Sequence, residues 1–149
     1  MEKELLNSGK ELLLKDLCAR LPYGVKCQIK GEEDFEPLKL KSFIQGKGFC
    51  AFDFYIKENL SLTFKELDEF KPYLFPISSM TEEQREEINK ITNGSVAISK
   101  HFFYDLCNCS KIYHFDVIAV IDWLNANRFD YRGLIEKGLA IDATGLNIY

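Results

Sequence analysis

The hydrophobic residues near the start of the chain are spaced as on one face of a helix. Ser8 and Glu11 match a capping box that marks a helix start, and Pro22 marks a stop. Between these limits the apolar positions recur three and four residues apart, which predicts a helix with one buried face. That face consists of Leu13, Leu14, Leu17, Cys18 and Leu21.

The spacing then changes to alternation, which predicts strands. Residues 25–30 and 38–44 alternate apolar residues with lysines and other polar residues, as in strands with one buried face. Residues 49–56 are apolar at most positions on both faces, so we expect a third strand that is covered on both sides. These strands predict a small antiparallel sheet or a partly closed barrel.

Capping-box patterns predict two short helices further along the chain. The four residues from Thr63 and the four from Thr81 both match this pattern, and we expect the second helix to run to about Thr92. Between the two helices, residues 71–76 contain two prolines and are expected to be extended. They suit an edge strand, where a missing N–H does no harm.

The most regular helical pattern lies at residues 112–125, where apolar residues follow the spacing of a buried helix face. Trp123 lies at the end of this helix and is expected in the core. Asp130 is expected to cap a short helix that Gly138 ends. The pattern as a whole predicts a single α+β domain over residues 1–149, with an N-terminal helix, a small sheet and C-terminal helices packed on it.

Composition and charge narrow the class of protein. Nineteen basic and 23 acidic residues give a net charge of −4, which argues mildly against a dedicated duplex-DNA binder. No segment approaches the roughly 18 apolar residues that a membrane span needs, and the N-terminus does not have the pattern of a secretory signal. We therefore expect a cytoplasmic protein without a membrane partner, whose five cysteines stay as thiols.

Three stretches carry a resemblance to known sequences. They are KDLCARLPYG (15–24), KPYLFPISSMTEE (71–83) and FDYRGLIEKGLA (129–140). They resemble a group of small, uncharacterised proteins encoded by phages and integrated mobile elements of gut anaerobic bacteria. The resemblance implies a bacterial or phage cytoplasmic setting and an accessory role, and it implies no reaction.

Motifs for metals and cofactors are weak. The two histidines and two of the cysteines lie within fourteen residues, and thiolate and imidazole are ligands that zinc prefers. Their spacing is poor, so we favour a loop with ordinary thiols over a metal site. Gly46-Lys47-Gly48 lacks the residues of a phosphate-binding loop, and no cofactor is expected. The candidate metal ligands are His101, Cys107, Cys109 and His114.

A second candidate set consists of residues that can contact a ligand or a partner. Four lysines are expected on the outer face of the first two strands, where they either meet phosphates or keep the sheet soluble. Asp53 lies among apolar residues, and a half-buried carboxylate there would need a partner or a shifted pKa. We favour the alternative, in which Asp53 faces solvent. Arg132 is expected to pair locally with Asp130 or Glu136. The set is Lys26, Lys30, Lys39, Lys41, Asp53, Tyr55 and Arg132.

The sequence supports two hypotheses on function. The first is a non-enzymatic accessory protein that binds a macromolecule; a protein partner is favoured over nucleic acid. The second is a small-ligand or nucleotide-binding protein, with a pocket between the aromatic third strand and the C-terminal helix. We favour the first, because no catalytic motif is recognisable.

Overall fold

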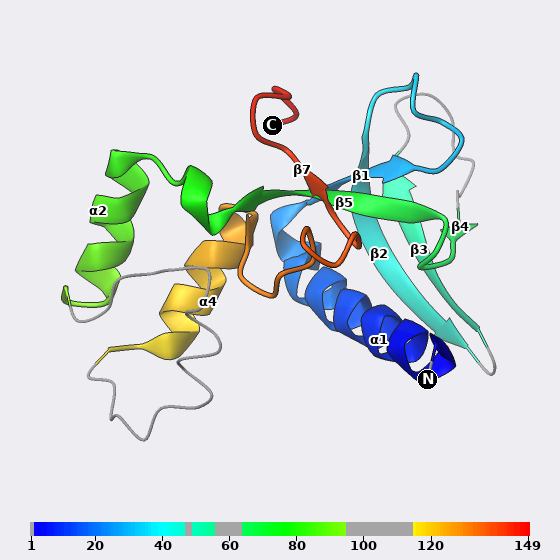
Figure 1. The fold of residues 1–149 in the computed structure, drawn as a ribbon, viewed down its shortest axis with the longest axis horizontal. Helices are drawn as coiled ribbons and strands as arrows, with labels where there is room; N and C mark the ends of the chain where they lie inside the picture. Colours follow the sequence, from blue (N-terminus) through cyan, green and yellow to red (C-terminus); the bar gives the residue numbers. More distant parts are fainter. Residues whose placement is uncertain (1, 47–48, 56–63, 95–114) are drawn as a thin grey trace.

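The computed structural model describes residues 2–46, 49–55, 64–94 and 115–149. One long helix lies against a twisted sheet, and two shorter helices lie together beyond one end of that sheet (Figure 1). The helices are α1 (Glu2–Arg20), α2 (Glu82–Ile91) and α4 (Val117–Ala126). The strands are β1 (Lys26–Ile29), β2 (Leu38–Gly46), β3 (Phe49–Tyr55), β4 (Phe64–Lys65), β5 (Phe70–Pro76), β6 (Phe129–Asp130) and β7 (Ile141–Asp142).

The seven strands form one open, mixed sheet. Their order is β4-β3-β2-β1-β5-β6, and β7 also pairs with β5. Strands β1 to β5 pair antiparallel, whereas β6 and β7 pair in parallel with β5. The α+β prediction is therefore confirmed. Within the described residues the sheet does not close into a barrel, and the C-terminal strands make it mixed instead of purely antiparallel.

β5 lies inside the sheet, although its prolines suggested an edge strand. It pairs with β1 along its first half and with β6 and β7 along its second half. The N–H of Lys30 donates to the carbonyl of Glu69 (2.9 Å). The backbone polar groups of Glu69, and of every second residue after it, therefore point toward β1. Pro72 consequently faces away from β1, and its missing N–H removes no bond to that strand.

Two expected helix starts are wrong. α1 begins at Glu2 instead of Ser8, because residues 2–7 are mostly good helix formers and continue the helix. No helix follows Thr63: Phe64 and Lys65 form β4 against β3, and a turn then leads into β5. Pairing with a neighbouring strand overrides the local capping pattern there.

The capping box expected at Thr81 is formed, whereas the cap of α4 lies at Asp116, where none was expected. Thr81 and Gln84 complete the capping box of α2, and Asn93 and Gly94 end the helix with positive φ. α4 begins at Val117, because the carboxylate of Asp116 accepts from the N–H groups of Ile118 (2.9 Å) and Ala119 (3.1 Å). The helix is expected from about residue 112, but Phe115 and Asp116 are not helical; residues 112–114 lie outside the described residues.

Two hydrophobic clusters make up the core. The first joins α1 to β1, β2, β3 and the start of β5, and the apolar stripe of α1 contributes Leu13 and Leu17 to it. All four positions from Ala51 to Phe54 are buried, so this part of β3 is covered on both faces as expected, whereas Tyr55 at its end is exposed. The second cluster joins α2, α4 and β6. There Trp123 is half-buried, stacks on Phe129 at 5.7 Å and donates its Nε1–H to Glu87 (3.1 Å).

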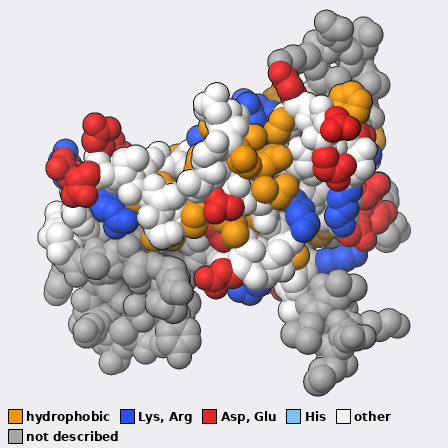
Figure 2. All heavy atoms as spheres, turned by 45° about the horizontal axis from the view of Figure 1, so that its top comes forward, with side chains coloured by type: hydrophobic (Ala, Val, Ile, Leu, Met, Phe, Trp, Pro, Cys, Tyr) orange, Lys and Arg blue, Asp and Glu red, His pale blue; other side chains and the backbone are white. Residues whose placement is uncertain are grey.

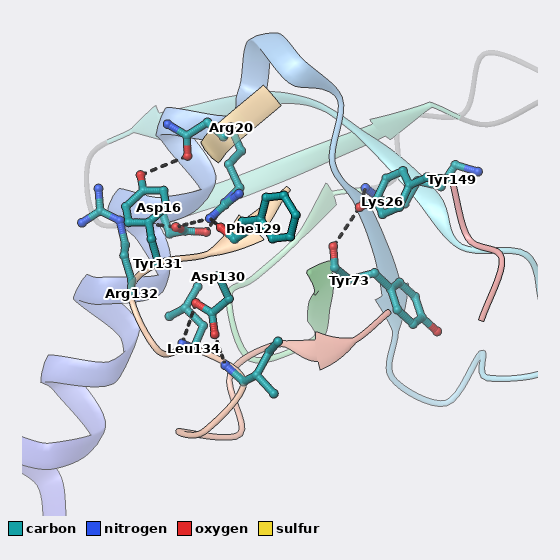
Figure 3. A network of polar contacts seen from close by, with 12 residues as sticks. Asp16, Arg20, Lys26, Tyr73, Phe129, Asp130, Tyr131, Arg132, Leu134 and Tyr149 are labelled. Carbon is teal, nitrogen blue, oxygen red and sulfur yellow. Dashed lines mark hydrogen bonds and ion pairs between the residues drawn. The ribbon is translucent and has the colours of Figure 1, made fainter. Parts of the chain in front are cut away.

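A buried charge network connects the last turns of α1 to β6 (Figure 3). Asp16 and Arg20 are both fully buried, and Nε and Nη2 of Arg20 donate to the Asp16 carboxylate at 2.6 and 3.1 Å. Nη2 also donates to the Phe129 carbonyl (2.8 Å), and the guanidinium lies 5.3 Å from the centre of the Tyr131 ring. Arg20 therefore joins two segments that are 109 residues apart in the sequence.

The segment after β6 is a turn instead of the expected short helix. The carboxylate of Asp130 accepts from the N–H groups of Leu134 (2.9 Å) and Ile135 (2.8 Å), so its capping role is confirmed. Arg132 does not pair locally as expected: its Nε lies 3.3 Å from the carboxylate of Asp16 on α1. This long-range partner leaves no signal in the neighbouring sequence.

We expect Asp16→Asn to lower the free energy of unfolding by about 3–5 kcal/mol. The substitution leaves the fully buried Arg20 guanidinium without its counter-charge, although the shape of the side chain is kept. Urea denaturation measures the effect through the midpoint. Glu11→Gln is the control, because it removes an exposed pair with Lys15 on the same helix and should leave the urea midpoint almost unchanged. Similar effects for the two variants would contradict the burial of the pair.

Candidate functional site: a lysine-lined apolar cavity

A cavity of about 920 Å³ opens between α1, the start of β5 and the turn at 137–139. This volume lies within the range of small-molecule sites, roughly 300–1,000 Å³. The lining residues come from segments far apart in the sequence, so the cavity exists only in the assembled fold. They are Ser8, Gly9, Lys10, Leu12, Leu13, Lys30, Leu67, Asp68, Phe70, Lys71, Lys137, Gly138 and Leu139.

The wall of the cavity is largely apolar. Leu13 and Phe70 belong to the buried first cluster, so the deepest part of the wall is the edge of the core itself. Leu12, Leu67 and Leu139 are half-buried and pack against that cluster. An apolar group in this cavity would replace water on surface that the fold leaves uncovered, which is favourable by about 25 cal/mol per Å².

α1 approaches the turn that closes the cavity at Gly9. A Cβ at this position would lie 3.6 and 3.8 Å from the two methyl carbons of Leu139. These are ordinary contact distances, so the helix and the turn touch here without strain. The approach fixes one side of the cavity.

Four lysines and one aspartate line the same cavity. Nζ of Lys10 donates to Asp68 (3.1 Å), and this hydrogen bond holds the pKa of Asp68 below its usual value. Nζ of Lys137 donates to a backbone carbonyl only. Within the described part of the chain neither Lys30 nor Lys71 has a salt bridge. The cavity is thus positively charged in a chain whose net charge is −4.

Of the residues expected to contact a ligand, Lys30 alone lines this cavity. Sequence reasoning missed Lys10, Lys71 and Lys137, because they are far apart in the chain and no local pattern connects them. The cavity does not lie between the third strand and the C-terminal helix, where the sequence predicts a pocket: Phe52 and Phe54 of β3 pack in the first cluster, and Val120 and Leu124 of α4 pack in the second.

The structure brings four other candidates together on the outer face of the sheet. Lys39 pairs in register with Tyr55, and their side chains therefore stand side by side. The ammonium groups of Lys39 and Lys41 lie 5.6 and 5.9 Å from the centre of the Tyr55 ring. Asp53, the fourth, is only 3% exposed and lies 3.1 Å from Nζ of Lys41, so the expectation that it faces solvent is wrong.

Lys26 is held by the C-terminal residues. Its Nζ donates to the carbonyl of Ile148 (2.6 Å) and lies 5.9 Å from the centre of the Tyr149 ring. The Tyr149 hydroxyl accepts from the backbone N–H of Lys26 (3.0 Å) and donates to the carbonyl of Tyr73 (2.8 Å). The last residue therefore packs on the sheet, and burial raises the pKa of its phenol to about 12.

The expected metal ligands His101, Cys107, Cys109 and His114 lie outside the described residues. Among the residues that are described, no group of three or more potential ligands is placed to hold a metal ion. None of the described helices combines the length and the apolar character needed to cross a membrane.

Fold and cavity together define an α+β protein with an open mixed sheet and a basic, apolar-walled pocket. No protein-family model, curated protein or solved structure matches the chain. The candidate site is consequently argued from its own residues.

Gly9→Ala should stabilise the protein by about 0.5–1 kcal/mol, because alanine favours a helix interior and its Cβ meets Leu139 at ordinary distances. Thermal or urea unfolding measures the change. Gly31→Ala is the matched control: its Cβ has open space, but its φ is +78°, so about 1 kcal/mol should be lost. A loss at Gly9 would show that the helix and the turn are closer than described.

The stability that the Tyr149 hydroxyl contributes should fall as the pH rises from about 10 to about 12. The folded protein holds the phenol proton more tightly than the unfolded chain, so deprotonation across this range favours unfolding. Urea denaturation of wild type and Tyr149→Phe at several alkaline pH values measures the difference. The advantage of wild type over the variant should shrink through this range, and a constant difference would contradict the hydrogen-bonded role of the hydroxyl.

Proposed function

We propose that the protein is a binding protein for a small amphiphilic anion, which occupies the lysine-lined cavity. The observation that carries this proposal is the combination of an apolar wall with four lysines around one space of about 920 Å³. Basic residues are in the minority in this chain, yet they gather here. An anionic head group and an apolar body match the two parts of the lining.

The charges of the lining favour binding over catalysis. Asp68 is the single acidic residue among the lining residues, and its carboxylate is engaged by Lys10. General acid–base chemistry needs a titrating group within reach of a substrate proton, and an ion-paired carboxylate at the rim is poorly suited to this. Lys30 and Lys71 instead offer positive charge to a ligand.

The aromatic content of the lining favours an aliphatic ligand over a nucleotide. Phe70 is the single aromatic residue in the lining, and it is fully buried. Its ring makes edge contacts with Phe52 and Phe54 at 5.5 and 5.0 Å between centroids. A nucleobase would therefore have no exposed ring on which to stack, whereas an alkyl chain needs only the leucine surface.

We also propose a setting for this binding protein. The resemblance of residues 15–24, 71–83 and 129–140 to proteins of phages and mobile elements supports an accessory role in such an element. A protein partner for the whole chain remains a prediction of the same resemblance. The cavity adds a small ligand to that prediction.

The test is calorimetric titration with alkyl carboxylates and alkyl phosphates of increasing chain length, below their micelle concentrations. Each added methylene that enters the cavity should tighten binding about fourfold, the equivalent of roughly 0.8 kcal/mol. Alkyltrimethylammonium ions of the same length should bind far more weakly, because the lysines repel them.

Lys30→Gln and Lys71→Gln should each weaken binding of the anions. Lys15→Gln is the control, since this substitution makes the same change of charge at an exposed position of α1 that does not line the cavity. Affinity that is independent of chain length, or equal for anions and cations, would refute the proposal.

A further inference from the structure

We infer that the outer face of β1, β2 and β3 binds single-stranded nucleic acid, at a surface separate from the cavity. This surface, here named the basic strip, carries two exposed lysines (Lys39 and Lys41), two half-buried cations (Lys26 and Arg128) and one exposed aromatic ring. It consists of Lys26, Lys39, Lys41, Tyr55 and Arg128.

Strand register lines up three members of the strip. Lys26 pairs with Lys39 across β1 and β2, and Lys39 pairs with Tyr55 across β2 and β3. Partners across strands project to the same face, and neighbouring strands lie about 4.8 Å apart. The three side chains therefore form a row roughly 10 Å long, with two cations beside an aromatic ring.

The two ends of the row carry the remaining cations. At one end Lys41 lies 5.9 Å from the centre of the Tyr55 ring. At the other end the Tyr149 ring lies 5.9 Å from Nζ of Lys26 and 4.3 Å from the Arg128 guanidinium. The bond from Lys26 to the Ile148 carbonyl holds this lysine in place, so less side-chain entropy is lost when it meets a phosphate.

Three acidic residues near the strip have partners in the described structure. Asp53 takes up part of the charge of Lys41, and its own side chain is almost completely buried. In the loop after β1, Glu32 lies 3.9 Å from Lys65, and Glu33 accepts from the N–H of Gly31. The strip therefore keeps positive charge although the chain is acidic.

An exposed aromatic ring distinguishes a single strand from other polyanions. Tyr55 is 55% exposed, although it lies in the sheet beside buried phenylalanines. Phosphates can draw Lys39 and Lys41 away from the ring, which leaves a surface on which a base can stack. A duplex hides its base faces, and an acidic peptide would use the cations without using the ring. The combination of ring and cations thus favours a single strand.

The experiment is fluorescence anisotropy with labelled twelve-residue oligo(dT) and oligo(U), a duplex of equal length, and polyglutamate as competitor. We expect the single strands to bind at low salt, with the duplex and polyglutamate at least tenfold weaker. Tyr55→Ala should weaken single-strand binding by roughly five- to 150-fold, and Tyr55→Phe should retain it. Lys39→Gln should lower the slope of log affinity against log salt by about 0.7.

Two controls separate this surface from the rest of the chain. Lys15→Gln makes the same charge change away from the strip, and Lys71→Gln removes a cavity lysine; neither should alter single-strand binding. Urea denaturation should show that the Tyr55 variants are folded. The inference is overturned if no strand binds at low salt, if polyglutamate competes equally, or if Tyr55→Ala binds as well as Tyr55→Phe.

Discussion

The buried ion pair between Asp16 and Arg20 is the constraint on which the rest of the fold depends. Removing two charges from water costs several kcal/mol per ion, and one pairing alone does not offset it. The Phe129 carbonyl and the Arg132 guanidinium supply the additional partners. α1 and the segment that contains β6 therefore stabilise each other: without α1, Arg132 would lose the carboxylate of Asp16, and without that segment, Arg20 would lose the Phe129 carbonyl. Phe129 and Arg132 thus join the C-terminal segment to the first helix.

This coupling also places the cavity. Once Asp16 and Arg20 fix the C-terminal end of α1 against β6, the chain after β6 must return along the helix to reach β7. On that path Leu139 meets Gly9, and Lys137 comes to the same opening as Lys10. The cavity is the space beside α1 where the chain between β6 and β7 leaves the edge of the core uncovered. Its lysines owe their proximity to the route of the chain, and this explains why they share no sequence pattern.

Sequence reasoning succeeded where the neighbouring residues determine the structure. Alternation along β1 and β2, the apolar residues on both faces of β3 and the capping box at Thr81 were sufficient, because each element has the local pattern that its environment requires. It failed where a distant partner decides. Thr63 is followed by a strand because β3 is available for pairing, Arg132 turns to a helix more than one hundred residues earlier, and Asp53 is buried beside Lys41. The grouping of Lys39 and Tyr55 was predictable in principle from strand register, whereas the cavity required the complete topology.

The net charge of −4 is a poor guide to the partners of this chain, because its charges are segregated. α2 exposes most of its glutamates, and Figure 2 shows acidic side chains at both ends of the face that it draws. The basic strip and the lysine-lined cavity lie on other parts of the fold: the strip includes Lys26 of β1, and the cavity includes Lys30, which directly follows β1. At physiological ionic strength charges are screened beyond about 8 Å, so an anion at either surface responds mainly to the local lysines. An acidic chain can therefore present two basic surfaces, and the argument from net charge against nucleic acid applies to the whole molecule but not to this face of the sheet.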